Sequence, residues 1–153
     1  MKFSQLCMLV AVTTAIVGCD IGPESPRGFS LPEGDVTEGE KVFFNYQCLS
    51  CHQLKGLEQP DILDNPALSI PLGGKTDKVK TYAELVTAII NPSHTIAKGY
   101  PKSSVQTDGV SSMNNYNSVM TVDELVNLVV FLQPYYKLDP YTKTQYSPYI
   151  FEE

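Results

Sequence analysis

The sequence lacks any excess of positive charge. Lys and Arg together number 11 against 17 Asp and Glu, which gives a net charge of −6 over 153 residues. Proteins that bind nucleic acid present basic surface to the phosphates, so this balance argues against a nucleic-acid partner. The acidic charge instead favours a protein partner with a basic surface. The length suits one domain with tails, not two domains.

No apolar run is long enough to span a bilayer comfortably. Residues 6–17 are apolar, follow the positive Lys2 and have the length of a secretory signal core. Residues 16–19, Ile-Val-Gly-Cys, resemble a bacterial lipobox, in which the Cys becomes the lipidated first residue. The sequence therefore predicts a lipoprotein signal peptide over residues 1–18 and a lipid anchor on Cys19. An ordinary signal peptide with a chance Cys is the alternative.

The predicted anchor also predicts a location. A lipidated chain lies outside the cytoplasm, and several acyl chains hold a protein firmly on a membrane. By resemblance to enteric lipoproteins, Asp20 beside the anchor favours the periplasmic face of the inner membrane over the outer membrane or cell surface. Residues 19–34, rich in Gly, Pro and Ser, are predicted to be a flexible tether to the domain.

Cysteine is scarce, and no pair is left for a disulfide. Of the four cysteines, Cys7 leaves with the signal peptide and Cys19 takes lipid. Cys48 and Cys51 directly precede His52 in the Cys-x-x-Cys-His attachment signature of c-type haem. Two thiols at this spacing reach the two vinyl groups of the porphyrin, and the next residue is placed to bind the iron. The predicted cofactor is one covalent haem c.

Two other kinds of site use similar motifs. A structural zinc site needs four ligands, and few candidates remain beyond the motif: His94, and Cys19 if it is not lipidated. A thioredoxin-like redox pair would lie in a βαβ pattern, which the sequence does not show. We expect His94 to be a solvated loop residue.

The first predicted helix covers residues 36–46. Its apolar face is formed by Gly39, Val42, Phe43 and Tyr46, at helical spacing. A glycine inside a helix costs up to about 1 kcal/mol relative to Ala, so Gly39 is either tolerated or allows another helix to approach closely. Two pairs fit the N-terminal capping box: Asp35 with Glu38, and Thr37 with Glu40.

Two further helices are predicted, over residues 82–90 and 122–133, and no convincing alternating strand is present. Each helix begins with a Thr and Glu capping box, and each stops at a proline. The segments 53–80 and 93–119 are long, irregular loops, which compact domains rarely carry unless the loops pack on something else, such as a large cofactor. The caps and stops are Thr81 with Glu84, Thr121 with Glu124, Pro92 and Pro134.

A sixth ligand for the haem iron has two Met candidates once the signal peptide is removed. Met120 directly precedes the cap Thr121, where its side chain would staple against Leu125. Met113 lies in an irregular loop and is free to project inward, so Met113 is the predicted ligand opposite His52. His94 or an open site remain as alternatives. Thioether ligation predicts a positive, moderately high reduction potential.

These motifs resemble the mono-haem class I c-type cytochromes over roughly residues 35–134. Gly39 and Phe43 match the family's first helix, and residues 128–132 match its last helix. In that family the two helices cross near a right angle, with the Gly against an aromatic residue, here Phe131. The resemblance implies an all-α small cytochrome c fold, with three main helices and long loops wrapped round one covalent haem.

Two positions depart from the family pattern. A Pro usually follows the ligand Met, whereas Asn114 and Asn115 follow Met113 here. The family also has a Pro whose backbone carbonyl accepts the proton on the second nitrogen of the ligand His, a contact that orients the ring. Pro71 is the predicted residue for this role, and Pro60 competes with it.

The expected function is single-electron transfer between membrane-bound redox proteins on the periplasmic side, with no catalysis and no small-molecule substrate. One alternative is an electron-transfer subunit of a dehydrogenase or oxidase complex. Another is a haem sensor or gas binder, which needs a displaceable sixth ligand. Residues 135–153 form a Tyr-rich tail, either packed over the domain or exposed as a docking segment.

Overall fold

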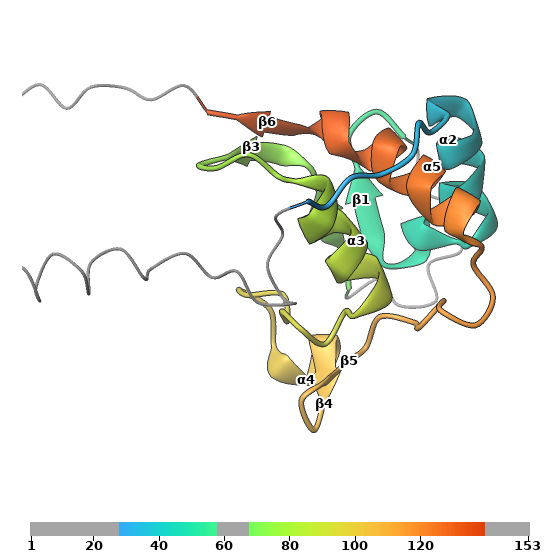
Figure 1. Ribbon diagram of the computed structural model, residues 1–153. Helices are drawn as coiled ribbons and strands as arrows, with labels where there is room; N and C mark the ends of the chain where they lie inside the picture. The colour runs from blue at the N-terminus through green and yellow to red at the C-terminus, as the bar shows by residue number, and fades with distance from the viewer. Residues whose placement is uncertain (1–27, 58–67, 140–153) are drawn as a thin grey trace, which may run out of the picture. The chain divides into compact units, whose positions relative to one another are not determined.

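The computed structural model describes residues 28–57 and 68–139 (Figure 1). The predicted signal peptide, Cys19 and Pro60 lie outside the described residues. The chain divides into two compact units, and the second, Leu31–Glu153, contains the predicted domain. No helix among the described residues is both long and apolar enough to cross a bilayer.

Three main helices frame this unit, at the positions that the apolar spacing predicts. They are α2 (Val36–Asn45), α3 (Tyr82–Ile90) and α5 (Val122–Leu132). A one-turn helix that the sequence analysis did not anticipate, α4 (Lys102–Val105), lies in the loop between α3 and α5. Two short 3₁₀ helices, η1 (Cys48–Ser50) and η2 (Gln133–Tyr135), follow α2 and α5.

Two of the predicted capping boxes are confirmed. The Thr81 hydroxyl accepts the Glu84 N–H at 3.2 Å, and the Glu84 carboxylate accepts the Thr81 N–H at 3.0 Å. Thr121 and Glu124 make the same reciprocal pair, at 3.2 and 2.8 Å. These bonds satisfy N–H groups that the first helical turn leaves without partners.

The first helix is capped by Asp35. Its carboxylate accepts the N–H groups of Thr37 at 2.7 Å and Glu38 at 3.0 Å, which lowers the pKa of Asp35. The Glu38 side chain pairs instead with Lys41 at 2.7 Å. Of the two predicted pairs, the structure therefore selects Asp35 as the cap, without the reciprocal half of the box.

The helices α2 and α5 touch at Gly39. A Cβ atom there would overlap the backbone carbonyl of Asn127 and lie 2.7 Å from the Cβ of Phe131. The rings of Phe43 and Phe131 pack beside this contact with centroids 5.7 Å apart. The close approach of two helices, not simple tolerance, explains this glycine.

The core lies between the three helices and the segment that follows α2. Leu49 and Leu54, which flank the haem motif, are buried with the apolar faces of the helices. Leu31 packs against this cluster, so the end of the predicted tether belongs to the compact unit. The buried cluster is Val42, Phe43, Leu49, Leu54, Leu85, Val86, Ile89, Leu128, Val129, Phe131 and Leu132.

Three short strand pairs among the described residues correct the expectation of a domain without strands. Each strand is two or three residues long, which is too short to produce an alternating pattern in the sequence. β1 (His52–Leu54) pairs parallel with β2 (Ile70–Leu72), and β3 (Gly74–Thr76) pairs parallel with β6 (Tyr136–Leu138). β4 (Gln106–Thr107) and β5 (Val110–Ser111) form an antiparallel pair.

The beginning of the predicted tail packs on the domain through β6. Tyr135 and Tyr136 are partly buried against the core cluster. Gly73 makes room for this, because a Cβ there would lie 2.7 Å from the Tyr135 Cβ. The Asp139 N–H donates to the Thr76 carbonyl at 2.8 Å and continues the pairing. The other aromatic residues of the tail lie outside the described residues.

Gly39→Ala should destabilise the haem-loaded protein. Alanine is ordinarily the better helix former, but here its methyl group would force α2 away from the α5 backbone. We expect the free energy of unfolding to fall by about 1–3 kcal/mol, the usual cost of overpacking. Denaturant unfolding measures this, with the exposed position Asn45→Ala as the control. An unchanged midpoint for Gly39→Ala would contradict the contact.

Candidate haem-attachment site

The haem motif begins where α2 ends. Gln47 adopts the left-handed conformation, with φ 53°, and turns the chain out of the helix. The turn η1 follows, in which the Cys51 N–H donates to the Cys48 carbonyl at 3.3 Å. Both cysteines of this turn are partly buried, and Leu49 between them is buried.

His52 is oriented by the pairing of β1 with β2. Its Nδ1 lies 3.2 Å from the Ile70 carbonyl oxygen, and the Ile70 N–H donates to the Cys51 carbonyl at 2.9 Å. A carbonyl only accepts, so Nδ1 carries the proton and Nε2 is the nitrogen that would bind iron. Burial lowers the pKa of His52, and the bond to Ile70 opposes this in part. A neutral imidazole is the form that binds a metal.

The predicted role of Pro71 needs a correction of one residue. The carbonyl beside His52 Nδ1 belongs to Ile70, and Pro71 stands opposite Gln53 in the strand pair with its side chain exposed. The family pattern predicts a proline at this contact. Any residue has a backbone carbonyl, so this contact depends on the register of β2 and leaves no signature in side-chain identity.

The chemistry of Cys48 is that of a buried thiol. Burial raises its pKa to about 11, so the sulfur is protonated at neutral pH. Thioredoxin-like redox cysteines work through a lowered pKa, which is the opposite shift. Both motif cysteines are outside any disulfide. Residues 28–57 and 68–139 also contain no cluster of three His, Cys, Asp or Glu side chains that could hold a metal ion.

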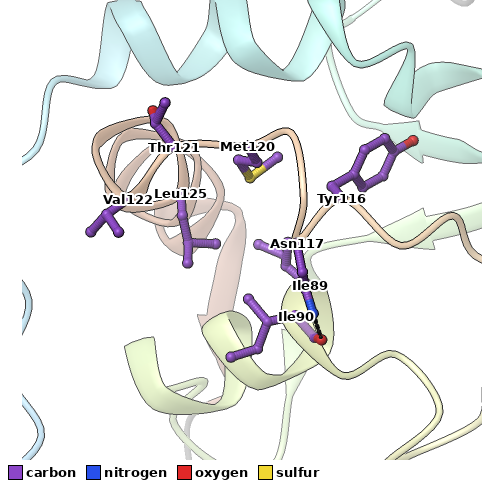
Figure 2. Close-up of a pocket in the computed structure, with 8 residues that line it drawn as sticks. All are labelled: Ile89, Ile90, Tyr116, Asn117, Met120, Thr121, Val122 and Leu125. Atoms are coloured by element: carbon purple, nitrogen blue, oxygen red, sulfur yellow. Dashed lines mark hydrogen bonds between the residues drawn. The ribbon is translucent and has the colours of Figure 1, made fainter.

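The two methionines occupy different places. Met113 is partly exposed in the loop after β5, and its N–H donates to Ser111 Oγ at 3.2 Å. Met120 packs against the core and lines a mainly apolar cavity of about 230 Å³ together with Leu125 (Figure 2). Met120 and Leu125 thus line the same cavity, and a direct staple between them stays a prediction. Within the described residues, the hydrogen bond of Met113 is to Ser111 and not to residues 48–52, and its ligation to iron stays a prediction.

Two loop residues that the sequence analysis did not single out tie the Met113 loop to its surroundings. The Tyr116 hydroxyl donates to the Tyr46 carbonyl at 3.2 Å, and the Asn117 amide donates to the Ile90 carbonyl at 2.8 Å. Their only signal in the sequence is that they lie three and four positions after Met113. His94 is exposed in the loop after α3, as predicted.

The cytochrome c family model matches residues 36–134, and the chain belongs to this family. No curated protein and no solved structure matches the chain significantly. The domain therefore has the cytochrome c fold and a role in haem-based electron transfer.

The residues at the site fit the family's cofactor. Haem c binds covalently through the thiols of a Cys-x-x-Cys-His motif, and Cys48 and Cys51 have that spacing. Both cysteines are partly buried and outside any disulfide, so two thiols remain for thioether bonds, and the proton on Nδ1 leaves His52 in the tautomer that binds iron. When bound, haem c supplies a one-electron Fe(III)/Fe(II) couple.

Ile70→Pro should weaken the support of His52, whereas Pro71→Ala should not. The first change removes the N–H that bonds to the Cys51 carbonyl and holds β2 beside β1. We expect Ile70→Pro to lower the unfolding free energy of the holoprotein by about 1–3 kcal/mol. Pro71→Ala should change it by about 1 kcal/mol at most. Paired denaturant titrations check this, and a larger loss for Pro71→Ala would count against Ile70 as the relevant residue.

Proposed function

We propose that the protein is a mono-haem class I c-type cytochrome that carries single electrons between membrane-bound redox proteins. It is held on the periplasmic face of the inner membrane by lipid on Cys19. The iron ligands are His52 and Met113. The charge of −6 suits partners with basic surfaces.

The observation that carries the proposal is the orientation of His52 within the motif. The sequence has a single Cys-x-x-Cys-His segment, which supports one haem per chain. His52 is held through Nδ1 by the Ile70 carbonyl at 3.2 Å. A hydrogen bond of this kind fixes the ring and raises the basicity of the ligating nitrogen.

In this function the protein's residues attach the haem, bind its iron and limit the access of water. Cys48 and Cys51 tether the cofactor and His52 holds its iron, so the redox centre stays with the chain. The buried apolar side chains around the motif, such as Leu49 and Leu54, limit water at the site. A thioether from Met113 would fill the sixth position and favour the reduced state relative to a second imidazole. Electron transfer of this type requires no proton donor and no substrate pocket.

Met113→Ala should remove thioether ligation from the folded, haem-loaded protein. We expect loss of the weak far-red charge-transfer band of the oxidised form, a lower reduction potential and new binding of carbon monoxide to the reduced form. Absorption spectra and a redox titration measure these changes. Met120→Ala is the matched control and should keep the band. If Met120→Ala lost the band instead, the ligand assignment would be reversed.

Cys19→Ala should release the protein from membranes. Without a lipidated Cys, no acyl chains remain to hold the chain on the bilayer. Fractionation after a salt wash, followed by haem staining, should find wild type in the membrane pellet and the variant in the soluble fraction. A variant that stays in the washed pellet would refute the lipid anchor. Stable copurification of wild type with a larger redox complex would favour the subunit role over the free carrier.

A further inference from the structure

The loop that carries Met113 has no proline after the methionine. Asn114 and Asn115 follow the methionine, so the backbone keeps rotational freedom that a proline would remove. A loop of this kind holds a ligand poorly unless other contacts restrict it. The structure supplies such contacts on both sides of Met113.

The N-terminal side of the loop is attached to the segment between α3 and α5. The Ser112 N–H donates to the Val105 carbonyl at 2.9 Å, and the Ser111 N–H donates to Ser93 Oγ at 3.0 Å. The Ser111 hydroxyl oxygen then accepts the Met113 N–H at 3.2 Å. The backbone is therefore restrained up to the methionine itself.

The C-terminal side is attached to α2 through Tyr116. Its hydroxyl donates to the carbonyl of Tyr46, which lies two residues before Cys48. The two rings also pack edge to face, with centroids 5.2 Å apart and planes at 73°. The Tyr116 carbonyl accepts the N–H groups of Val119 at 3.0 Å and Met120 at 2.9 Å, which makes the following turn compact.

The Tyr46 side chain also links the end of α2 to the loop and to α5. Its hydroxyl lies 3.2 Å from the Val119 carbonyl oxygen and 3.1 Å from Glu124 Oε2. One hydroxyl proton is thus shared between the end of the loop and the first turn of α5. The loop, α5 and Tyr46, two residues before the haem motif, form one connected group.

Asn117 attaches the loop to α3. Its side-chain amide donates to the Ile90 carbonyl at 2.8 Å, drawn as the dashed line in Figure 2. Ile90 is the last residue of α3, and helix ends leave carbonyls without intrahelical partners. The Asn117 N–H also donates to Asn115 Oδ1 at 2.9 Å, so this residue closes a local turn as well.

We infer that Tyr116 and Asn117 are positioning residues for the sixth iron ligand. This inference rests on the proposed ligation by Met113. The two side chains join the segment after Met113 to α2 and α3, and so restrain the loop in place of the proline that is missing after the methionine. Neither residue touches the iron in this assignment. Each acts by lowering the fraction of molecules in which the loop swings away.

Imidazole binding to the oxidised holoprotein tests the inference, because imidazole competes with the thioether for the sixth position. The variants are Tyr116→Phe and Asn117→Ala. Tyr116→Phe removes the bond to the Tyr46 carbonyl and the longer one, at 3.5 Å, from the Asn114 amide, and Asn117→Ala removes the bond to the Ile90 carbonyl. Each loss should raise the open fraction, and with it the apparent affinity for imidazole, about two- to tenfold. The double variant should bind more tightly than either single variant.

Two matched controls remove the same chemical groups elsewhere. Tyr100→Phe removes a hydroxyl for which the described structure records no hydrogen bond, and Asn45→Ala removes an exposed amide. Both should bind imidazole with wild-type affinity. Far-UV circular dichroism should show the same helix content for all variants, and Asn117→Ser serves if Asn117→Ala fails to fold.

The inference is overturned if both loop variants keep the far-red band and bind imidazole no more tightly than the controls, even if their melting temperatures fall. Such a result would mean that these bonds serve general stability alone. Failure of the proposed ligation is seen separately, in Met113→Ala. A band that survives in Met113→Ala would remove the ligand on which the inference rests.

Discussion

The contact between α2 and α5 at Gly39 is the constraint on which the rest of the domain depends. Because no side chain separates the helices there, the Asn127 backbone and the Phe131 side chain reach the surface of α2 directly. Phe43 then packs beside Phe131 in the core, and the end of α2 is held in position. Cys48 lies three residues after the last residue of α2, so this packing determines where the haem motif begins.

A second level of organisation uses backbone groups, not side chains. The His52 ring is oriented by the Ile70 carbonyl, and the Tyr116 and Asn117 side chains bond to the carbonyls of Tyr46 and Ile90. A backbone carbonyl is present whatever the residue type, so such contacts survive substitution of the residue that supplies it. His52 can therefore be supported without a proline at the carbonyl that it contacts, and the proposed ligation by Met113 would depend on backbone contacts of the same kind.

The short strand pairs have a related role. The pairing of β1 with β2 places Ile70 beside His52, although 18 positions separate them along the chain. The pairing of β3 with β6 carries the start of the Tyr-rich tail back onto the domain, where Gly73 provides space for Tyr135. Each pair joins segments that the helices alone would leave unconnected, which is how long loops are accommodated in this small domain.

The sequence by itself determined the features that depend on local spacing. The three main helices, the caps at Thr81 and Thr121, and the placement of Cys48, Cys51 and His52 follow from short-range rules, because helical periodicity and haem attachment both act over a few residues. Tertiary structure alone decided which carbonyl faces His52, which cap starts α2, and where the tether ends and Leu31 joins the core. These outcomes depend on how distant segments meet in space. A strand of two or three residues is too short for its sequence to indicate which other strand it pairs with.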